Sequence, residues 1–317
     1  MKKIIAVICV MLMVLSMSAC AKKDDGKYVV GVCQLVEHEA LSAATKGFMD
    51  AIVAELGEEN VEFDVQIAAG DSAMCTNIVL DFVSKDVDLI LANATPALQA
   101  AAAATEDIPI LGTSITEYSV ALNLENYNGT VGGNISGTSD LAPLDQQAAM
   151  IQEWFPDAKN VGLLYCAAEA NSLYQVNAVQ GYLEGMGYTC KQYAFSSTAD
   201  MDAVTRDAAA ESDVIYVPTD NTVAESTGII YGICSPAGVP VIAGEQGICA
   251  GCGVATLSIS YYDLGTTTGK MAVKILKGEA DISTMKVEYA ETFTPLYNAD
   301  ICAELNISVP EGYDPIP

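Results

Sequence analysis

Basic residues are scarce in this chain. Lysine and arginine together number 14 against 41 aspartate and glutamate residues, which gives a formal net charge of −27. Arg206 is the single arginine and His38 is the single histidine. Nucleic-acid binding needs basic side chains along the phosphate backbone, so this composition excludes nucleic acid as a partner. A phosphorylated ligand is disfavoured for the same reason, and the acidity is most simply a source of solubility.

The signatures of common enzymes are also missing. The chain has no G-x-S-x-G, G-x-x-x-x-G-K-[ST] or H-E-x-x-H motif. A Ser–His–Asp triad would have to use His38, and nothing around that residue favours this role. We therefore predict that the chain is not an enzyme, and we expect no cofactor. Tryptophan is scarce as well, since Trp154 stands alone, whereas sugar sites usually stack rings on tryptophan.

Cysteine, in contrast, is plentiful at ten residues. Several cysteines lie in predicted strands or helices, where a free thiol behaves as a small apolar side chain. Cys249 and Cys252 have the spacing of a redox or metal-ligand pair, but without a second pair or a histidine the zinc signal is weak. We predict no metal, and a local disulfide between these two residues stays open.

The beginning of the chain is typical of an export signal. Lys2 and Lys3 precede an apolar run, Ile4 to Met17, and Ser18-Ala19-Cys20 follow. The run is too short to span a bilayer, which needs about 20 residues. We predict a signal peptide over residues 1–19 and a bacterial lipobox in which Cys20 becomes the lipidated N-terminus. Residues 20–27 then form a polar tether, and simple secretion is the alternative.

The rest of the chain contains an internal repeat. Asp213 opens the stretch DVIYVPTDNT, and Asp88 opens DLILANATP, with the same apolar run and the same polar exit. Two further pairs match, Gly31 with Gly162 and Pro109 with Pro240. The three pairs are separated by 125, 131 and 131 residues. This near-constant offset predicts two lobes with the same order of strands and helices, and a cleft between them is a preferred ligand site.

Apolar β-rich runs alternate with amphipathic helical segments along both halves. Predicted strands cover 28–35, 61–68, 88–92, 108–112, 161–165, 189–195, 214–217 and 239–243, and predicted helices include 40–56, 72–84, 144–155, 171–183 and 264–276. This alternation predicts an α/β fold with parallel sheets covered on both faces. We assign residues 28–138 and 253–285 to the first lobe, and 139–252 and 286–317 to the second.

Polar residues follow the predicted strands where a ligand would be held. Thr219, Asp220 and Asn221 come directly after an apolar run, and Asn93-Ala94-Thr95-Pro96 follows the equivalent run. In parallel sheets ligands bind at the carboxyl ends of strands. Helix capping is the alternative for Asp220 and Asn221, since both residue types satisfy free N–H groups at a helix start. The repeated polar exit favours the ligand-binding interpretation.

Seven motifs, in order along the chain, carry a family resemblance. They are QLVEHEAL (34–41), NATPALQ (93–99), GGNISGTSD (132–140), EANS (169–172), YVPTDN (216–221), GE (244–245) and SYYDLG (260–265). Together they resemble the substrate-binding lipoproteins of ABC importers associated with tryptophan and tyrosine uptake. The resemblance implies a type I periplasmic-binding-protein fold: two Rossmann-like lobes with parallel sheets, joined by a three-segment hinge that closes around the ligand.

An aromatic amino acid is the ligand that this resemblance implies. Its ammonium group needs a carboxylate, for which Asp220 is the first candidate and Glu169 the second. Its carboxylate has no arginine available, so hydroxyls of Thr95, Ser139 and Ser172 with backbone N–H groups are expected to hold it. The full set of predicted ligand-binding residues is Gln34, His38, Ala94, Thr95, Ser139, Asp140, Glu169, Asn171, Ser172, Asp220, Asn221 and Glu245.

The resemblance also implies an extracytoplasmic, membrane-anchored protein whose partners are an ABC permease and ATPase, and we expect a monomer. Two alternatives stay open. The same fold binds other amino acids or small polar solutes, and it also serves as a ligand sensor for a membrane partner. The sequence by itself does not separate a transport role from a sensor role.

Overall fold

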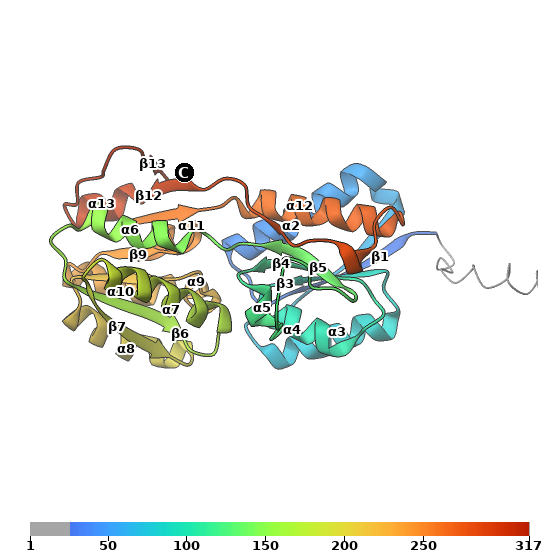
Figure 1. Cartoon of the computed structure of the whole chain (residues 1–317), viewed down its shortest axis with the longest axis horizontal. Helices are drawn as coiled ribbons and strands as arrows, with labels where there is room; N and C mark the ends of the chain where they lie inside the picture. Colours follow the sequence, from blue (N-terminus) through green and yellow to red (C-terminus); the bar gives the residue numbers. More distant parts are fainter. Residues whose placement is uncertain (1–25, 317) are drawn as a thin grey trace, which may run out of the picture.

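Two sheets form two lobes that lie side by side along the long axis of the molecule (Figure 1). A computed structural model describes residues 26–316; the predicted signal peptide and Cys20 lie outside the described residues. The sheet of the first lobe has the order β11-β5-β4-β3-β1-β2, and all its strand pairs are parallel. Its strands are β1 (Tyr28–Gln34), β2 (Val61–Ile67), β3 (Leu89–Asn93), β4 (Ile110–Ile115), β5 (Ile135–Ser139) and β11 (Glu288–Tyr289).

The sheet of the second lobe has the order β13-β12-β10-β9-β8-β6-β7. Its strands are β6 (Asn160–Cys166), β7 (Thr189–Phe195), β8 (Val214–Val217), β9 (Val241–Ala243), β10 (Ala255–Ser258), β12 (Thr294–Tyr297) and β13 (Asp314–Pro315). Only the pair of β10 with β12 is antiparallel in this described sheet. Parallel strands need crossover helices, which is why both lobes are layered α/β structures.

Helices cover both faces of each sheet. The first lobe has α2 (Glu39–Leu56), α3 (Ser72–Lys85), α4 (Thr95–Ala104), α5 (Tyr118–Ala121), α12 (Tyr261–Leu276) and the short η1 (Glu58–Asn60) and η2 (Ile282–Thr284). The second has α6 (Leu144–Trp154), α7 (Ala170–Gly185), α8 (Thr198–Glu211), α9 (Asn221–Glu225), α10 (Thr227–Ala237), α11 (Gln246–Cys252) and α13 (Ala299–Glu304). None of the helices within residues 26–316 is long and apolar enough to cross a membrane.

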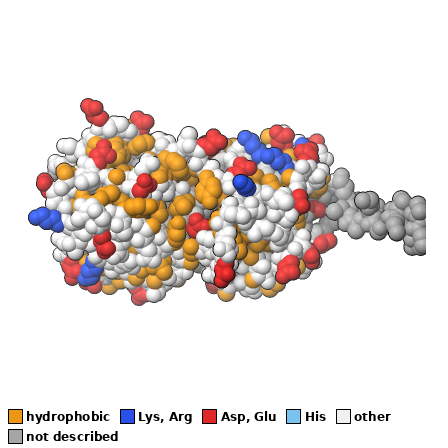
Figure 2. All heavy atoms as spheres, in the orientation of Figure 1, with side chains coloured by type: hydrophobic (Ala, Val, Ile, Leu, Met, Phe, Trp, Pro, Cys, Tyr) orange, Lys and Arg blue, Asp and Glu red, His pale blue; other side chains and the backbone are white. Residues whose placement is uncertain are grey.

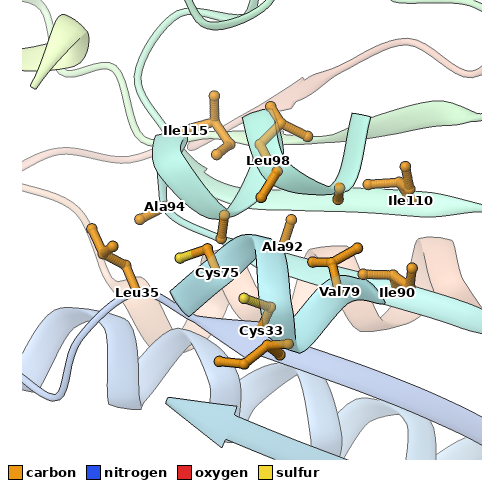
Figure 3. Packing of buried hydrophobic residues seen from close by; sticks show 14 of the residues in the cluster. Cys33, Leu35, Cys75, Val79, Ile90, Ala92, Ala94, Leu98, Ile110 and Ile115 are labelled. Atoms are coloured by element: carbon orange, nitrogen blue, oxygen red, sulfur yellow. The ribbon is translucent and has the colours of Figure 1, made fainter. Parts of the chain in front are cut away.

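The core of the first lobe has two parts, one on each face of its sheet. Figure 3 shows Val79 of α3 and Leu98 of α4 packed with Ile90 and Ile110 of the central strands. On the opposite face, Phe48 of α2 and residues of α12 pack against the same strands. Side chains on both sides of these strands are therefore buried, which explains why the strands are nearly continuous apolar runs rather than alternating patterns.

The structure confirms the internal repeat. In each lobe the central strands have the order 2-1-3-4-5, read as β2-β1-β3-β4-β5 and β7-β6-β8-β9-β10. Asp88 and Asp213, which occupy equivalent positions in the two copies, make equivalent hydrogen bonds. The Oδ2 atom of Asp88 accepts a hydrogen bond from the Val29 N–H at 2.7 Å, and that of Asp213 accepts one from the Asn160 N–H at 2.8 Å. Each aspartate thus ties the start of its strand to the neighbouring first strand.

Three segments join the lobes: residues 140–143, 259–260 and 290–293. The predicted boundaries differ from these positions. Residues 253–258, predicted in the first lobe, include β10, which pairs with β9 and β12 in the second sheet. Conversely, β11 pairs with β5 of the first sheet, although residues from 286 onward and Ser139 were predicted in the second lobe. The reason is the repeat itself, because β10 is the fifth strand of the second copy just as β5 is of the first.

The Cys249 and Cys252 pair lies on α11 and is buried in the core of the second lobe. Burial raises the pKa of both thiols. The eight described cysteines are free thiols, and no group of described residues could hold a metal ion. The pair therefore contributes to the core as small apolar side chains, one of the alternatives that the sequence left open.

Close packing of α12 on α2 fixes the first lobe to the returning chain. The two backbones approach so closely that a Cβ atom at Gly265 would collide with the carbonyl oxygen of Ala44, and one at Gly47 would collide with that of Tyr262. Glycine is therefore required on both helices at this crossing, although it costs helix propensity. Because α12 begins directly after the second crossing, this contact also anchors one hinge segment.

We expect Gly265→Ala to lower the free energy of unfolding by about 1–3 kcal/mol, because the added methyl group forces the two backbones apart. The matched control is Gly181→Ala on α7, where a Cβ atom meets nothing within 4 Å. There the gain in helix propensity should raise stability by about 0.5–1 kcal/mol. Urea denaturation of both variants measures the effect. Equal effects at the two positions would contradict the requirement for close packing at Gly265.

Candidate ligand-binding site

A small cavity lies between the two lobes at the carboxyl ends of their strands. The surrounding side chains leave about 10 Å³ for the centre of a water-sized sphere, which is roughly the space of one water molecule. The residues that line it are His38, Ala40, Leu41, Ser114, Thr116, Asp140, Asn171, Thr219, Asp220, Asn221, Ala224, Glu245 and Tyr261. Several lie at a strand end or in the loop that follows a strand, among them Thr116, Asp140 and Asp220, as the doubly wound topology predicts. No lysine or arginine is among the lining residues, whereas three are carboxylates.

Two residues beside the cavity have unusual backbone conformations. Ser114, near the end of β4, is in the left-handed region with φ of 56°. Ala94, after β3, has φ of 88° and ψ of 156°, a region that is normally reserved for glycine. The Ala94 N–H donates to the Thr113 carbonyl at 3.1 Å. Such strained residues cluster at functional sites, and Ser114 places its hydroxyl on the cavity wall.

Asp220 both lines the cavity and caps a helix. Its Oδ1 atom accepts from the Val223 N–H at 3.0 Å, and its Oδ2 atom accepts from the Cys166 N–H at 2.7 Å. The side chain is 1% exposed. Burial and the nearby Glu169 carboxylate raise the pKa of Asp220 to about 8, although the two N–H groups and the Ser172 hydroxyl oppose this shift. The capping alternative from the sequence is therefore present in the structure, together with the cavity position.

Glu169 lies beside the cavity, where five donors surround its carboxylate. Its Oε1 atom accepts from the Thr222 N–H and hydroxyl at 2.9 and 2.8 Å. Its Oε2 atom accepts from the backbone and side-chain nitrogens of Asn221 at 3.1 and 2.7 Å, and from the Asn171 side chain at 3.2 Å. Glu169 therefore holds the start of α9 against the start of α7. It faces an adjoining groove rather than the cavity itself.

Two further carboxylates complete the acidic lining. Glu245 caps α11 by accepting from the Gly247 and Ile248 N–H groups, and burial raises its pKa to about 7. Asp140 lies in the first crossing, and its Oδ2 atom accepts from the Tyr261 hydroxyl at 3.0 Å. Burial also raises the pKa of Asp140, while the Tyr261 and Thr116 hydroxyls lower it. The cavity therefore favours groups that bring positive charge or hydrogen-bond donors.

His38 bridges the cleft from the first lobe to the second. Its Nε2 atom lies 3.2 Å from the Oδ1 atom of Asn221, the first residue of α9. Burial lowers the pKa of His38, and the Asn221 contact opposes this change. His38 is also the N-cap residue of α2, but its side chain makes no capping hydrogen bond. The ring is therefore directed across the cleft. His38 is thus both a helix-start residue and a cleft residue.

Half of the predicted site residues line the cavity: His38, Asp140, Asn171, Asp220, Asn221 and Glu245. The other six lie behind or beside it: Gln34, Ala94, Thr95, Ser139, Glu169 and Ser172. Gln34, for example, accepts from the Thr45 hydroxyl at 2.7 Å, and the Ser139 hydroxyl donates to the Thr116 carbonyl at 2.9 Å. All six are buried: Ala94 is apolar, and the other five are polar.

Sequence reasoning missed several lining residues, among them Ser114, Thr116 and Tyr261. Ser114 and Thr116 follow the fourth predicted strand of the first lobe, so the rule that identified Thr219 and Asp220 would have found them. Tyr261 lies within the SYYDLG motif, but nothing in the local sequence directs its side chain to the cleft. Only the return of α12 to the first lobe brings its hydroxyl to Asp140.

Two α/β lobes around an enclosed cavity define a two-lobed binding protein. The family of ABC transporter substrate binding proteins matches residues 29–313, and the chain therefore belongs to it. This match confirms the resemblance drawn from the motifs. A family of substrate-binding proteins also confirms the prediction that the chain is not an enzyme. Substrate-binding proteins of ABC transporters work outside the cytoplasm together with the other components of the transporter.

The relatives agree with this assignment. The chain is 34% identical over 263 residues to a tyrosine-binding protein of Clostridioides difficile, covering 82% of this chain and 76% of that protein. A solved structure from Streptococcus pneumoniae, in complex with L-Trp, has a TM-score of 0.86 at 32% identity over 90% of this chain and 96% of its own. The ligand-free, open structure of a substrate-binding protein with adhesive properties from Clostridium difficile has a TM-score of 0.70 at 35% identity, over 91% and 99%.

The chain is more similar in structure to the L-Trp complex than to the ligand-free, open structure, although the sequence identity to the open structure is slightly higher. The TM-score differs by 0.16, from 0.86 to 0.70.

The raised pKa values predict how stability depends on pH. Asp220 and Glu245 keep their protons to about pH 8 and pH 7 in the folded protein but release them near pH 4 when it unfolds. Their contribution is complete below about pH 4 and is lost as the pH rises through these values, so the free energy of unfolding should fall from pH 5 to pH 8. The slope reaches up to roughly 1.4 kcal/mol per pH unit for each group.

Urea denaturation at several pH values measures this slope. The control is the double variant Asp220→Asn, Glu245→Gln, which cannot titrate at these positions and should show a flatter profile. Parallel profiles for the parent and the double variant, or a parent that gains stability between pH 5 and pH 8, would show that these carboxyls are ionised in the folded protein.

Proposed function

We propose that this protein is the extracytoplasmic binding lipoprotein of an ABC importer and that it captures an aromatic amino acid (tryptophan, tyrosine or phenylalanine) by closure of its lobes. The observation that carries the proposal is the enclosed cavity, lined by carboxylates and by the apolar or aromatic side chains of Leu41 and Tyr261. The names of two relatives support it, since one is a tyrosine-binding protein and the other contains L-Trp.

The chemistry of the cavity suits a zwitterion with an apolar side chain. Carboxylates and amide oxygens take the ammonium group. The ligand carboxylate has no basic side chain nearby, so hydroxyls such as those of Thr116 and Thr219 and backbone N–H groups take it. Thr95, Ser139 and Ser172, which the sequence proposed for this role, are not among the lining residues. Closure excludes water and strengthens each of these interactions.

A ligand panel tests this function. The three aromatic L-amino acids should raise the melting temperature of the protein, because binding to the folded state stabilises it by about 2.7 kcal/mol at 100 times the Kd. Sugars and nucleosides should leave it unchanged. L-tryptophan amide should bind at least about tenfold more weakly than L-tryptophan, since a hydrogen bond to a charged group contributes roughly 1.5–3 kcal/mol. Equal affinity for the acid and the amide would show that the ligand carboxylate is not bound as proposed. A rise in melting temperature with a sugar but with no amino acid would reject an aromatic amino acid as the ligand.

We also propose that acylated Cys20 anchors the protein to the outer face of the cytoplasmic membrane as a monomer, with residues 21–27 as a tether. The Met17-Ser-Ala-Cys20 sequence supports this anchor. Cys20→Ala should release the protein into the medium or block its processing, whereas Cys9→Ala, within the predicted signal peptide, should leave the anchor intact. Cell fractionation separates the outcomes, and full membrane retention of the Cys20→Ala variant would reject the lipid anchor.

A further inference from the structure

Three buried oxygen atoms on the cavity wall have no hydrogen-bond partner. They are the hydroxyl oxygen of Ser114, the Oδ1 atom of Asp140 and the Oδ1 atom of Asn171. The three residues are 7%, 5% and 5% exposed. An acceptor that is buried without a partner costs roughly 1–3 kcal/mol. Three such atoms around one cavity therefore indicate a ligand group that donates hydrogen bonds when the lobes are closed.

The orientation of the Asn171 amide is fixed by its surroundings. Its Nδ2 atom donates to Glu169 Oε2 at 3.2 Å, to the Ser172 hydroxyl at 3.3 Å and to the Thr219 carbonyl at 3.3 Å. A rotated amide would direct its oxygen at the Glu169 carboxylate and the Thr219 carbonyl, which have no proton to offer. The free Oδ1 atom is therefore an acceptor.

Among the carboxylates that line the cavity, Asp140 differs from the other two. Both oxygens of Asp220 accept backbone N–H groups, and Glu245 accepts the two N–H groups at the start of α11. Asp140 uses one oxygen for the Tyr261 hydroxyl, and its other oxygen makes no hydrogen bond, although the Thr116 hydroxyl also faces this carboxyl and lowers its pKa. The carboxylates of Asp220 and Glu245 are therefore occupied by backbone N–H groups, whereas Asp140 keeps one oxygen that can still accept a hydrogen bond.

The three acceptors come from three different parts of the molecule. Ser114 belongs to the first lobe, Asn171 to the second, and Asp140 to the first crossing between them. They line the same cavity between the lobes. Tyr261, which holds Asp140, is the first residue of α12 and follows the second crossing. A cation that binds all three oxygens would therefore contact both lobes and be linked to two of the three hinge segments.

We propose that Asp140, with Asn171 and Ser114, binds the ammonium group of the ligand, and that Tyr261 positions the Asp140 carboxylate for this contact. The proposal rests on the proposed function. An ammonium group has three N–H donors, which matches the three free acceptors, and it supplies the positive charge that the acidic cavity lacks. This assigns to Asp140 the role that the sequence gave first to Asp220. Binding of the cation at the hinge also explains why closure accompanies binding.

The test compares ligands with and without the ammonium group. Titration calorimetry on the purified full chain uses L-tryptophan and 3-indolepropionate, which lacks only that group. The parent should bind L-tryptophan at least about tenfold more tightly than 3-indolepropionate. In Asp140→Asn this preference should shrink to about threefold or less, because only the ammonium contact is lost. Affinity for 3-indolepropionate should change little, which a merely structural role of Asp140 would not produce.

Asp220→Asn tests the competing assignment, because Asp220 also lines the cavity. Its new amide would oppose the Cys166 N–H, so this variant should melt at a lower temperature without ligand yet keep the preference of the parent for L-tryptophan. An unchanged preference in Asp140→Asn, or its loss in Asp220→Asn alone, would overturn the assignment and return the ammonium group to Asp220. Failure of the parent to bind L-tryptophan, L-tyrosine or L-phenylalanine would instead overturn the proposed function, and the Asp140 assignment with it.

Discussion

Four carboxylates are buried around the cleft without a lysine or arginine beside them, and the rest of the site is arranged to stabilise them. Within residues 26–316 the ion pairs lie on exposed surfaces away from Asp140, Glu169, Asp220 and Glu245. Desolvation of an unpaired carboxylate is costly, so each must gain hydrogen bonds or keep its proton. Helix starts supply those bonds for three of them, because the first N–H groups of a helix have no partner inside it.

The hydrogen bonds from helix starts stabilise the fold and also determine which carboxylate oxygens remain available to a ligand. The carboxylates of Asp220 and Glu245 accept hydrogen bonds from the first N–H groups of α9 and α11. The Glu169 carboxylate accepts hydrogen bonds where α7 meets α9. Burial raises the pKa of Asp220 to about 8 and that of Glu245 to about 7, so near neutral pH these two carboxyls carry little of the charge that would attract a cation. The cleft offers free acceptors at only a few atoms, so the positions of those atoms rather than the total charge decide where a cation binds.

Acidic residues also outnumber basic residues on the surface of the protein. Asp and Glu side chains are spread over the face shown in Figure 2, where Lys and Arg are few. Exposed carboxylates remain hydrated and cost little, so they keep the protein soluble without deciding what it binds. The same residue types thus act differently inside and outside the cleft, because only burial removes the water that would otherwise neutralise their effect.

The sequence by itself determined the two-lobed α/β fold, the repeat, and the rule that polar residues after strands face a ligand. These features can be read from the sequence alone: the spacing of apolar residues, the turn residues, and the offset between Asp88 and Asp213. Only the tertiary structure decided which polar residues reach the cavity. Ser139 and Thr95 follow the rule yet lie behind the wall, whereas Tyr261 reaches Asp140 from a helix that crosses back between lobes. Whether an acceptor is already occupied depends on which distant N–H group meets it, and chain order does not contain that information.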